Sequence, residues 1–133
     1  MEDQRRLLFI CTINRSRSKT AEDIFSQDKR FKVKSAGTAP PCQSRVHVSL
    51  HRLNWADDIF VMESVHAKYL MNTFPQLFPD KSKYQEGLPK FPGYLELINK
   101  KRLYILDIAD VFAPNESELE DILKQKVSLA LGL

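Results

Sequence analysis

Unbroken apolar runs and amphipathic stretches alternate along the chain. Residues 7–10, 59–62 and 103–106 are three such apolar runs, and runs of this kind are typical of strands buried on both faces of a parallel sheet. Residues 31–35 instead alternate apolar side chains with lysines, which is the pattern of an edge strand protected against unwanted pairing. The pattern therefore predicts four strands.

Helical patterns follow each predicted strand. Residues 18–25 carry apolar side chains at helical spacing, and residues 44–54 predict a second helix with its first serine as the N-cap. A third helix is expected from Ser64, again as a cap, to about residue 72. Residues 115–118 resemble a capping box that opens a final amphipathic helix.

Length and composition fit one folded unit. The 133 residues are close to the usual size of a single domain, and 43% apolar with 28% charged residues is typical of a globular chain. The alternation of strands and helices then predicts one α/β domain over residues 1–133. We expect a three-layer sandwich in which helices cover both faces of a four-stranded parallel sheet.

Several classes of protein are disfavoured. No apolar run reaches the length of a membrane span, and the start of the chain lacks the pattern of a signal peptide. Two cysteines do not make a disulfide scaffold. The net charge of +3 is that of an ordinary solvated surface. We therefore expect a cytoplasmic protein without a nucleic-acid or membrane partner.

The segment 73–100 has no clear periodicity. It holds four of the seven prolines together with several aromatic residues, a composition that predicts a packed loop rather than a helix. A helical turn is expected over residues 94–99. Two interpretations remain open for the segment, a flap that faces a substrate or partner and a simple cover for the edge of the sheet.

Candidate chemistry is concentrated where the first strand meets the first helix. Cys11 ends the strand, and the amides of the following loop and first helical turn have no partners within the helix. Such amides and the helix dipole favour an anion, and the same field lowers the pKa of a thiol. The guanidinium of Arg17 matches two phosphate oxygens, and the hydroxyl of Ser18 is placed to donate to the sulfur. These groups together indicate phosphoryl transfer to sulfur.

Residues 11–18, Cys-Thr-Ile-Asn-Arg-Ser-Arg-Ser, resemble the Cys-x5-Arg-Ser phosphate loop of the low-molecular-weight protein tyrosine phosphatases. The SAGT sequence at residues 35–38 and the apolar strand at residues 56–62 also resemble that family, in particular a short bacterial branch. The resemblance implies a phosphatase-I-like, Rossmann-like fold with strand order 2-1-3-4 and a site at the carboxyl end of the first strand. It implies Cys11 and Arg17 as catalytic residues, needs no metal or cofactor, and places phosphate on the loop residues Thr12, Ile13, Asn14, Arg15, Ser16 and Ser18.

The resembled family uses the aspartate of an Asp-Pro pair as its general acid. Asp110 is the matching residue, with Val111 in the place of the proline and Phe112 in the place of a common tyrosine. Asp107 is the alternative acid. Phe112 is expected to flank an aromatic substrate.

The expected function is a cysteine-dependent phosphomonoester hydrolase, in particular a protein tyrosine phosphatase, acting through a phosphocysteine. Its substrate would be a phosphorylated protein or a small phosphomonoester. Two alternatives remain open: an arsenate reductase of the same fold, and a non-catalytic module that binds phosphate or phosphopeptides. A reductase with an internal cysteine relay needs more thiols than Cys11 and Cys42, and Cys42 is interpreted either as a resolving thiol or as a passive packing residue.

Three histidines complete the inventory of candidate residues. His47 and His51 are four apart, but no third ligand stands at a metal-binding spacing. We expect them to be solvated or bonded to neighbouring groups. The sequence suggests no partner for His66.

Overall fold

The computed structural model describes residues 4–79, 81–84 and 86–133. Its centre is a five-stranded sheet with the order β2-β1-β3-β5-β4. Four strands are parallel, and β4 runs antiparallel to β5. The strands are β1 (Arg5–Cys11), β2 (Phe31–Gly37), β3 (Asp58–Val61), β4 (Tyr94–Glu96) and β5 (Arg102–Ile105). The helices are α1 (Arg17–Phe25), α2 (Leu50–Trp55), α3 (Ser64–Thr73) and α4 (Ser117–Leu131), with short 3-10 turns at Pro75–Leu77, Lys81–Tyr84 and Ile98–Lys100.

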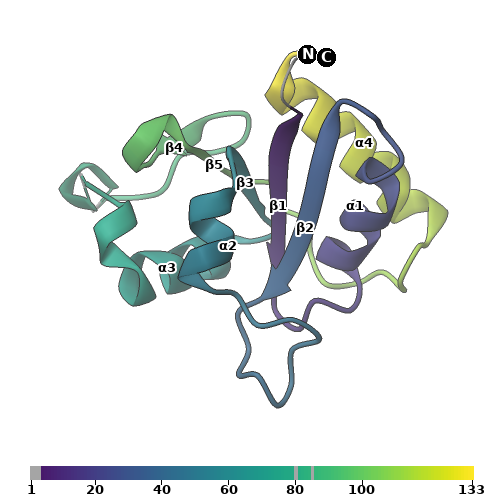
Figure 1. Cartoon of the computed structure of the whole chain (residues 1–133), viewed down its shortest axis with the longest axis horizontal. Helices are drawn as coiled ribbons and strands as arrows, with labels where there is room; N and C mark the ends of the chain where they lie inside the picture. Colours follow the sequence, from purple (N-terminus) through teal and green to yellow (C-terminus); the bar gives the residue numbers. More distant parts are fainter. Residues whose placement is uncertain (1–3, 80, 85) are drawn as a thin grey trace.

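Helices cover both faces of the sheet (Figure 1), so the predicted three-layer α/β architecture is confirmed. Leu7 and Phe9 of β1 pack on the face covered by α1 and α4, whereas Leu8 and Ile10 pack on the face covered by α2 and α3. A strand that is buried on both faces needs apolar side chains at every position. This requirement explains the unbroken apolar run. Among the described residues, no helix is both long and apolar enough to cross a membrane.

The four parallel strands lie in the order β2-β1-β3-β5. This is the expected order 2-1-3-4, because β5 is the strand that was predicted as the fourth. The expected number of strands was wrong by one. β4 was predicted as part of a helical turn and instead extends the sheet beyond β5. Leu95 is fully buried, and the ring of Tyr94 lies 5.3 Å from that of Tyr104 on the neighbouring strand. Burial of an apolar side chain and cross-strand packing favour the strand over the turn.

The helix predicted over residues 44–54 begins only at Leu50. Before it, the chain is extended and pairs with the end of β2, because the amide of Gly37 donates to the carbonyl of Val46 at 2.7 Å and Val48 donates to Gly37 at 2.9 Å. Ser49, rather than Ser44, caps the helix by accepting from the amide of Arg52 at 3.2 Å. Long-range pairing thus overrides the local helical pattern.

The caps of the last two helices also differ from those expected. Glu63 rather than Ser64 caps α3, in a capping box with His66. The expected capping box of α4 does not form, since Glu116 is the N-cap residue and its carboxylate accepts from the amide of Ala113 at 2.9 Å. Both helices nevertheless start within two residues of the predicted position.

Candidate functional site

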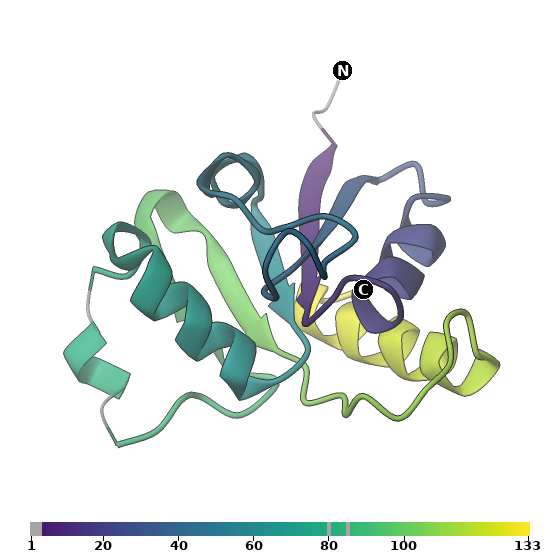
Figure 2. The same ribbon diagram turned by 90° about the horizontal axis from the view of Figure 1, so that it is seen from below.

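Three loops meet at the carboxyl ends of the parallel strands, the end seen in Figure 2. The loop of residues 12–16 joins β1 to α1. Its carbonyl groups face a second loop, residues 38–46 after β2, since Thr12 accepts from the amide of Ala39 at 2.8 Å and Ile13 accepts from that of Arg45 at 2.9 Å. The third loop, residues 107–115, follows β5.

The backbone amides of residues 13–18 differ from these carbonyls in their hydrogen bonding. Within the described part of the chain, none of them donates to a protein acceptor. Unpartnered amides in a turn that leads into a helix form a binding site for an anion, and the dipole of α1 favours the same charge.

Gly37 allows the first two loops to lie against each other. A Cβ atom at this position would stand 2.6 Å from the carbonyl oxygen of Thr12 and 2.7 Å from the hydroxyl of Ser44. Both distances are shorter than a carbon atom tolerates, so a larger residue would push the loop away from its supports. Steric crowding therefore explains why glycine occupies this position of the SAGT sequence.

Cys11 lies at the base of the loop, nearly buried, with its Sγ 2.9 Å from the Oγ of Ser18. Ser18 Oγ also accepts from the side-chain amide of Asn14 at 2.7 Å. Because Asn14 already donates to the Ser18 oxygen, the hydroxyl proton of Ser18 is free to be donated to another acceptor. The two acceptors within reach are the sulfur of Cys11 and the carbonyl of Ala36 at 3.5 Å, and the sulfur is nearer. We therefore assign the donation to the sulfur. Asn14 has φ of 59°, a left-handed conformation that asparagine tolerates better than most residues.

Arg17 is 2% exposed and lies between α3 and the loop that follows β5. Its Nη1 donates to the carboxylate of Glu63 and, at 2.8 Å, to the carbonyl of Ile108. The opposite edge of the guanidinium, formed by Nε and Nη2, has no hydrogen-bond partner among the described residues. That edge is the one that binds an oxyanion in bidentate fashion, so the protein holds Arg17 by one side and presents the other.

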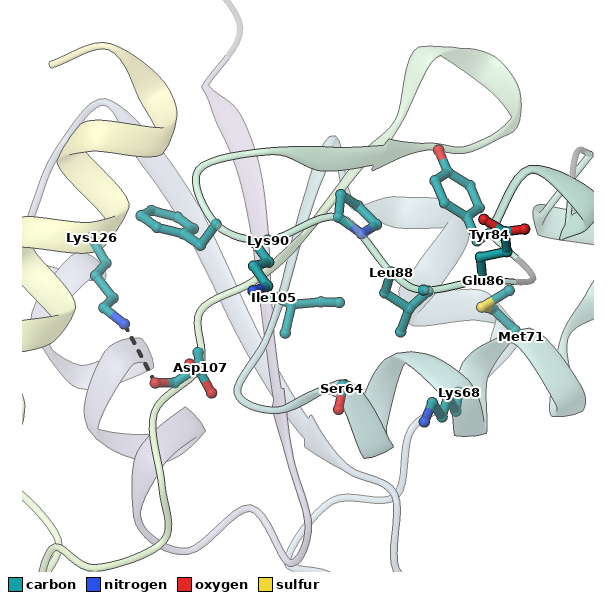
Figure 3. A pocket seen from close by; sticks show the side chains of 13 residues that line it. Ser64, Lys68, Met71, Tyr84, Glu86, Leu88, Lys90, Ile105, Asp107 and Lys126 are labelled. Atoms are coloured by element: carbon teal, nitrogen blue, oxygen red, sulfur yellow. Dashed lines mark hydrogen bonds between the residues drawn. The ribbon is translucent and has the colours of Figure 1, made fainter.

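The two candidate acids lie in different surroundings. The Oδ1 of Asp110 is 3.8 Å from Nε of Arg17, and its side chain is 61% exposed. Asp107 instead lines a cavity between α3 and the segment that precedes β4 (Figure 3). The structure brings Asp110 to Arg17 and leaves Asp107 facing this cavity. Phe112 is half-buried, and its carbonyl accepts from the hydroxyl of Ser16 at 2.8 Å, which ties the third loop to the first.

His66 belongs to the same cluster, although the sequence suggested no partner for it. It is 1% exposed, its Nδ1 accepts from the amide of Glu63 at 3.0 Å, and its Nε2 lies 2.9 Å from the hydroxyl of Thr12. Since Nδ1 is an acceptor, the proton is assigned to Nε2. Burial and the charge of Arg17 lower the pKa of His66 to about 4. The imidazole is therefore neutral near pH 7 and holds the loop through Thr12.

Glu63 was also not identified from the sequence. The available signal was its position, because it comes just after β3, and residues at the carboxyl ends of neighbouring parallel strands meet at one edge of the sheet. The three-residue spacing to His66 was a second signal, since it is the spacing of a capping box.

The remaining candidates lie at the rim or outside the site. Ile13 is 38% exposed, and Thr12 and Arg15 are exposed as well. Cys42 is a free, exposed thiol on the second loop. His47 Nδ1 lies 2.7 Å from the carbonyl of Ala39. In residues 4–79, 81–84 and 86–133 there is no group of three or more side chains suited to hold a metal ion.

Comparison with known proteins finds similarity in structure only. No protein-family model and no curated protein matches the sequence. Among solved structures, the arginine phosphatase YwlE from Geobacillus stearothermophilus aligns with a TM-score of 0.59 and 23% identity, covering 96% of this chain and 92% of that one. A low-molecular-weight protein tyrosine phosphatase from T. tengcongensis aligns with a TM-score of 0.63 and 21% identity, covering 98% of this chain and 100% of the other.

The same fold also occurs in a protein with different chemistry. A thioredoxin-dependent arsenate reductase from Corynebacterium glutamicum aligns with a TM-score of 0.55 and 16% identity, over 98% of this chain and 62% of the reductase. Because one fold can support several activities, the function must be argued from the site. The chain has the fold of the low-molecular-weight protein tyrosine phosphatases.

Proposed function

We propose that this protein is a cysteine-dependent phosphomonoester hydrolase that removes phosphate from phosphotyrosine in proteins through a phosphocysteine intermediate. One observation carries the proposal. The Sγ of Cys11 lies at the base of a loop whose amides at residues 13–18 donate to no acceptor among the described residues, and the edge of Arg17 beside it has no hydrogen-bond partner there. This is a nucleophile beside a binding site for three phosphate oxygens.

In the first step, the thiolate of Cys11 attacks phosphorus. The S–P bond forms while the bond from phosphorus to the leaving oxygen breaks. The loop amides and the Nε–Nη2 edge of Arg17 stabilise the charge on the other phosphate oxygens. Asp110 gives its proton to the leaving oxygen, which would otherwise depart as a costly anion.

In the second step, the carboxylate of Asp110 takes a proton from water as that water attacks the phosphocysteine. The S–P bond breaks, inorganic phosphate is released, and the electron pair returns to sulfur as a thiolate. The hydroxyl of Ser18, 2.9 Å from Sγ, stabilises this anion by a hydrogen bond. When phosphate leaves, Asp110 already carries the proton that it took from water, so it can act as the acid in the next cycle.

Glu63 and His66 act in this scheme as positioning residues. Glu63 accepts from Nη1 of Arg17 and so fixes the plane of the guanidinium. His66 holds Thr12. With a pKa lowered to about 4 by burial and by Arg17, His66 is deprotonated at the pH where the enzyme would work and is a poor candidate for the proton donor.

The two alternative functions are less well supported. Cys11 is buried, Cys42 is exposed, and the chain has no third cysteine, so a reductase with an internal relay of three thiols lacks its parts. A pure binding module would need neither a buried nucleophile nor a carboxylate 3.8 Å from Arg17. Both features are useful for turnover and of no benefit to binding.

Hydrolysis of p-nitrophenyl phosphate without added metal tests the proposal. Wild type and Cys42→Ser should turn over the substrate, whereas Cys11→Ser should not, although it should still bind vanadate. Binding of vanadate by wild type without hydrolysis of any phosphate ester would contradict the enzyme and favour the binding module. Arsenate reduction dependent on added thiol, in the absence of phosphatase activity, would favour the reductase.

A further inference from the structure

A cavity of about 740 Å³ lies beside the proposed active site, between α3 and the segment that precedes β4. Figure 3 shows α3 on one side of it and Lys126 of α4 with Asp107 on the other. Cys11 and residues 12–16 do not line it. Its volume falls in the range of ligand-binding pockets and is far larger than a single phosphate group requires.

The cavity adjoins the active site through the residues that hold Arg17. Ser64 lines it and directly follows Glu63, which accepts from Arg17. Asp107 also lines it and directly precedes Ile108, whose carbonyl accepts from the same guanidinium at 2.8 Å. The cavity therefore borders the two segments that hold Arg17 in place.

The lining combines apolar surface with unpaired positive charge. Met71, Leu88 and Ile105 contribute apolar side chains. Lys68 on α3 and Lys90 before β4 are exposed, and among the described residues the ammonium group of neither one forms an ion pair. The lining as a whole has three lysines and two carboxylates.

Lys126, the third lysine of the lining, is engaged differently. Its ammonium donates to the carbonyl of Leu106 and, at 3.4 Å, to that of Asp107. It thus supports the start of the loop after β5. The positive charge available to a ligand therefore comes from Lys68 and Lys90, which belong to two different segments of the lining.

We infer that this cavity binds the part of a phosphoprotein substrate that flanks the phosphorylated residue, and that it selects acidic side chains next to an apolar one. The inference rests on the proposed function and deepens it. Complementary charge gives orientation and specificity at such a surface, and the apolar floor supplies the area that desolvated side chains need.

Steady-state kinetics on two phosphotyrosine peptides tests this inference. The peptides have one apolar residue in common and differ only in carrying glutamates or glutamines around the phosphotyrosine. The variant is Lys68→Glu with Lys90→Glu, and both sites are exposed, so folding should be retained. The control is Lys32→Glu on β2, at the opposite edge of the sheet. p-Nitrophenyl phosphate, which has no flanking residues, serves as the control substrate.

Wild type should prefer the acidic peptide, and the double variant should lose about three- to tenfold in kcat/KM on that peptide, as expected for exposed charge pairs. The loss should shrink at high salt. Hydrolysis of p-nitrophenyl phosphate should be unchanged in both variants. Lys32→Glu should behave as wild type on every substrate.

Other outcomes would overturn the inference. Equal turnover of both peptides by wild type, or an equal loss in the double variant and in Lys32→Glu, would contradict it while leaving the hydrolase in place. Activation of p-nitrophenyl phosphate hydrolysis by a free dicarboxylate, without discrimination between peptides, would assign the cavity to a small effector instead. If wild type hydrolyses no phosphate ester at all, the proposed function fails, and the inference fails with it.

Discussion

The loop after β1 and the loop after β5 meet at one site but are held in opposite ways. The first is anchored on every side: its carbonyls bond to the second loop, Asn14 and Ser18 bond to each other, and Arg17 is 2% exposed. The loop after β5 is mostly exposed, with Val111 at 74% and the side chain of Asp110 at 61%. Ser16 of the first loop, and Arg17 and Thr20 of α1, each tie it to the rest of the site through one hydrogen bond.

This difference separates two tasks. Binding an anion needs donors fixed in advance, because a preorganised site spends no energy on reorganisation during the reaction. A proton donor must instead reach a leaving group whose size varies with the substrate, and an exposed loop allows this. Changes in the loop after β1 should therefore be tolerated poorly, whereas the effect of a change in the loop after β5 should depend on the residue and on the substrate.

The largest effect should come from Asp110→Asn, measured on phenyl phosphate, whose leaving group needs a proton. We expect kcat to fall by about 10²–10⁴-fold, the usual contribution of a general acid. Asp107→Asn is the matched control and should remain near wild type, because its carboxylate faces the cavity. The opposite ranking of the two variants would assign the acid to Asp107 and break the comparison between the loops.

The next largest effect should come from Arg17→Lys. Lysine cannot offer a two-pronged edge to phosphate while also bonding to Glu63 and Ile108, so kcat should fall by about 10²–10³-fold, the cost of losing one oxyanion donor. Arg15→Lys changes the same residue type at an exposed position of the same loop and should keep most activity. If Arg17→Lys also kept most of its activity, general positive charge rather than the fixed edge of the guanidinium would bind the anion.

His66 should make the stability of the protein depend on pH. Burial, reinforced by Arg17, lowers its pKa from 6.5 to about 4, so the unfolded chain binds the proton more tightly than the folded one. The stabilisation is complete above pH 6.5 and is lost as the pH falls toward 4, by up to about 3 kcal/mol at 1.4 kcal/mol per pKa unit.

Urea unfolding of wild type and His66→Gln at pH 7 and pH 4.5 measures this contribution. The free energy of unfolding of wild type should fall more steeply toward acid than that of the variant. His51→Gln, at an exposed histidine, controls for the loss of a titrating imidazole and should follow wild type. Parallel curves for all three proteins would show that His66 is not buried in its neutral form.

The smallest effect should come from Ser16→Ala, which removes the hydrogen bond to the carbonyl of Phe112. One neutral hydrogen bond contributes about 0.5–1.5 kcal/mol, so kcat should fall by only a few-fold and the pH profile should keep its shape. Ser26→Ala, at an exposed serine after α1, should have no effect. A loss as large as that of Asp110→Asn would mean that the position of the loop after β5 depends on this single hydrogen bond.

The sequence predicted the features that arise from neighbouring residues. The apolar runs identified β1, β3 and β5. The prediction of an anion site in the short loop after Cys11 likewise rests on local properties, which are backbone amides and a helix N-terminus. The short strand β4 was missed, because three residues carry little pattern and this strand is stabilised by packing on Tyr104.

The part of the site that was not predicted depends on contacts between distant residues. Glu63 is 46 residues from Arg17, and His66 is 54 residues from Thr12. A lone glutamate and a lone histidine look like ordinary helix residues until the sheet brings them to the loop. The same reason explains residues 44–49, whose helical pattern yielded to pairing with Gly37.

Direct detection of the covalent intermediate tests the central claim. Asp110→Asn should be mixed with p-nitrophenyl phosphate, a substrate that needs little help in leaving, quenched in acid within one turnover, digested and analysed by mass spectrometry. The account predicts phosphate on the peptide that carries Cys11, and none on the corresponding peptide of Cys11→Ser. Turnover without phosphate on Cys11, or phosphate on any other residue, would contradict it.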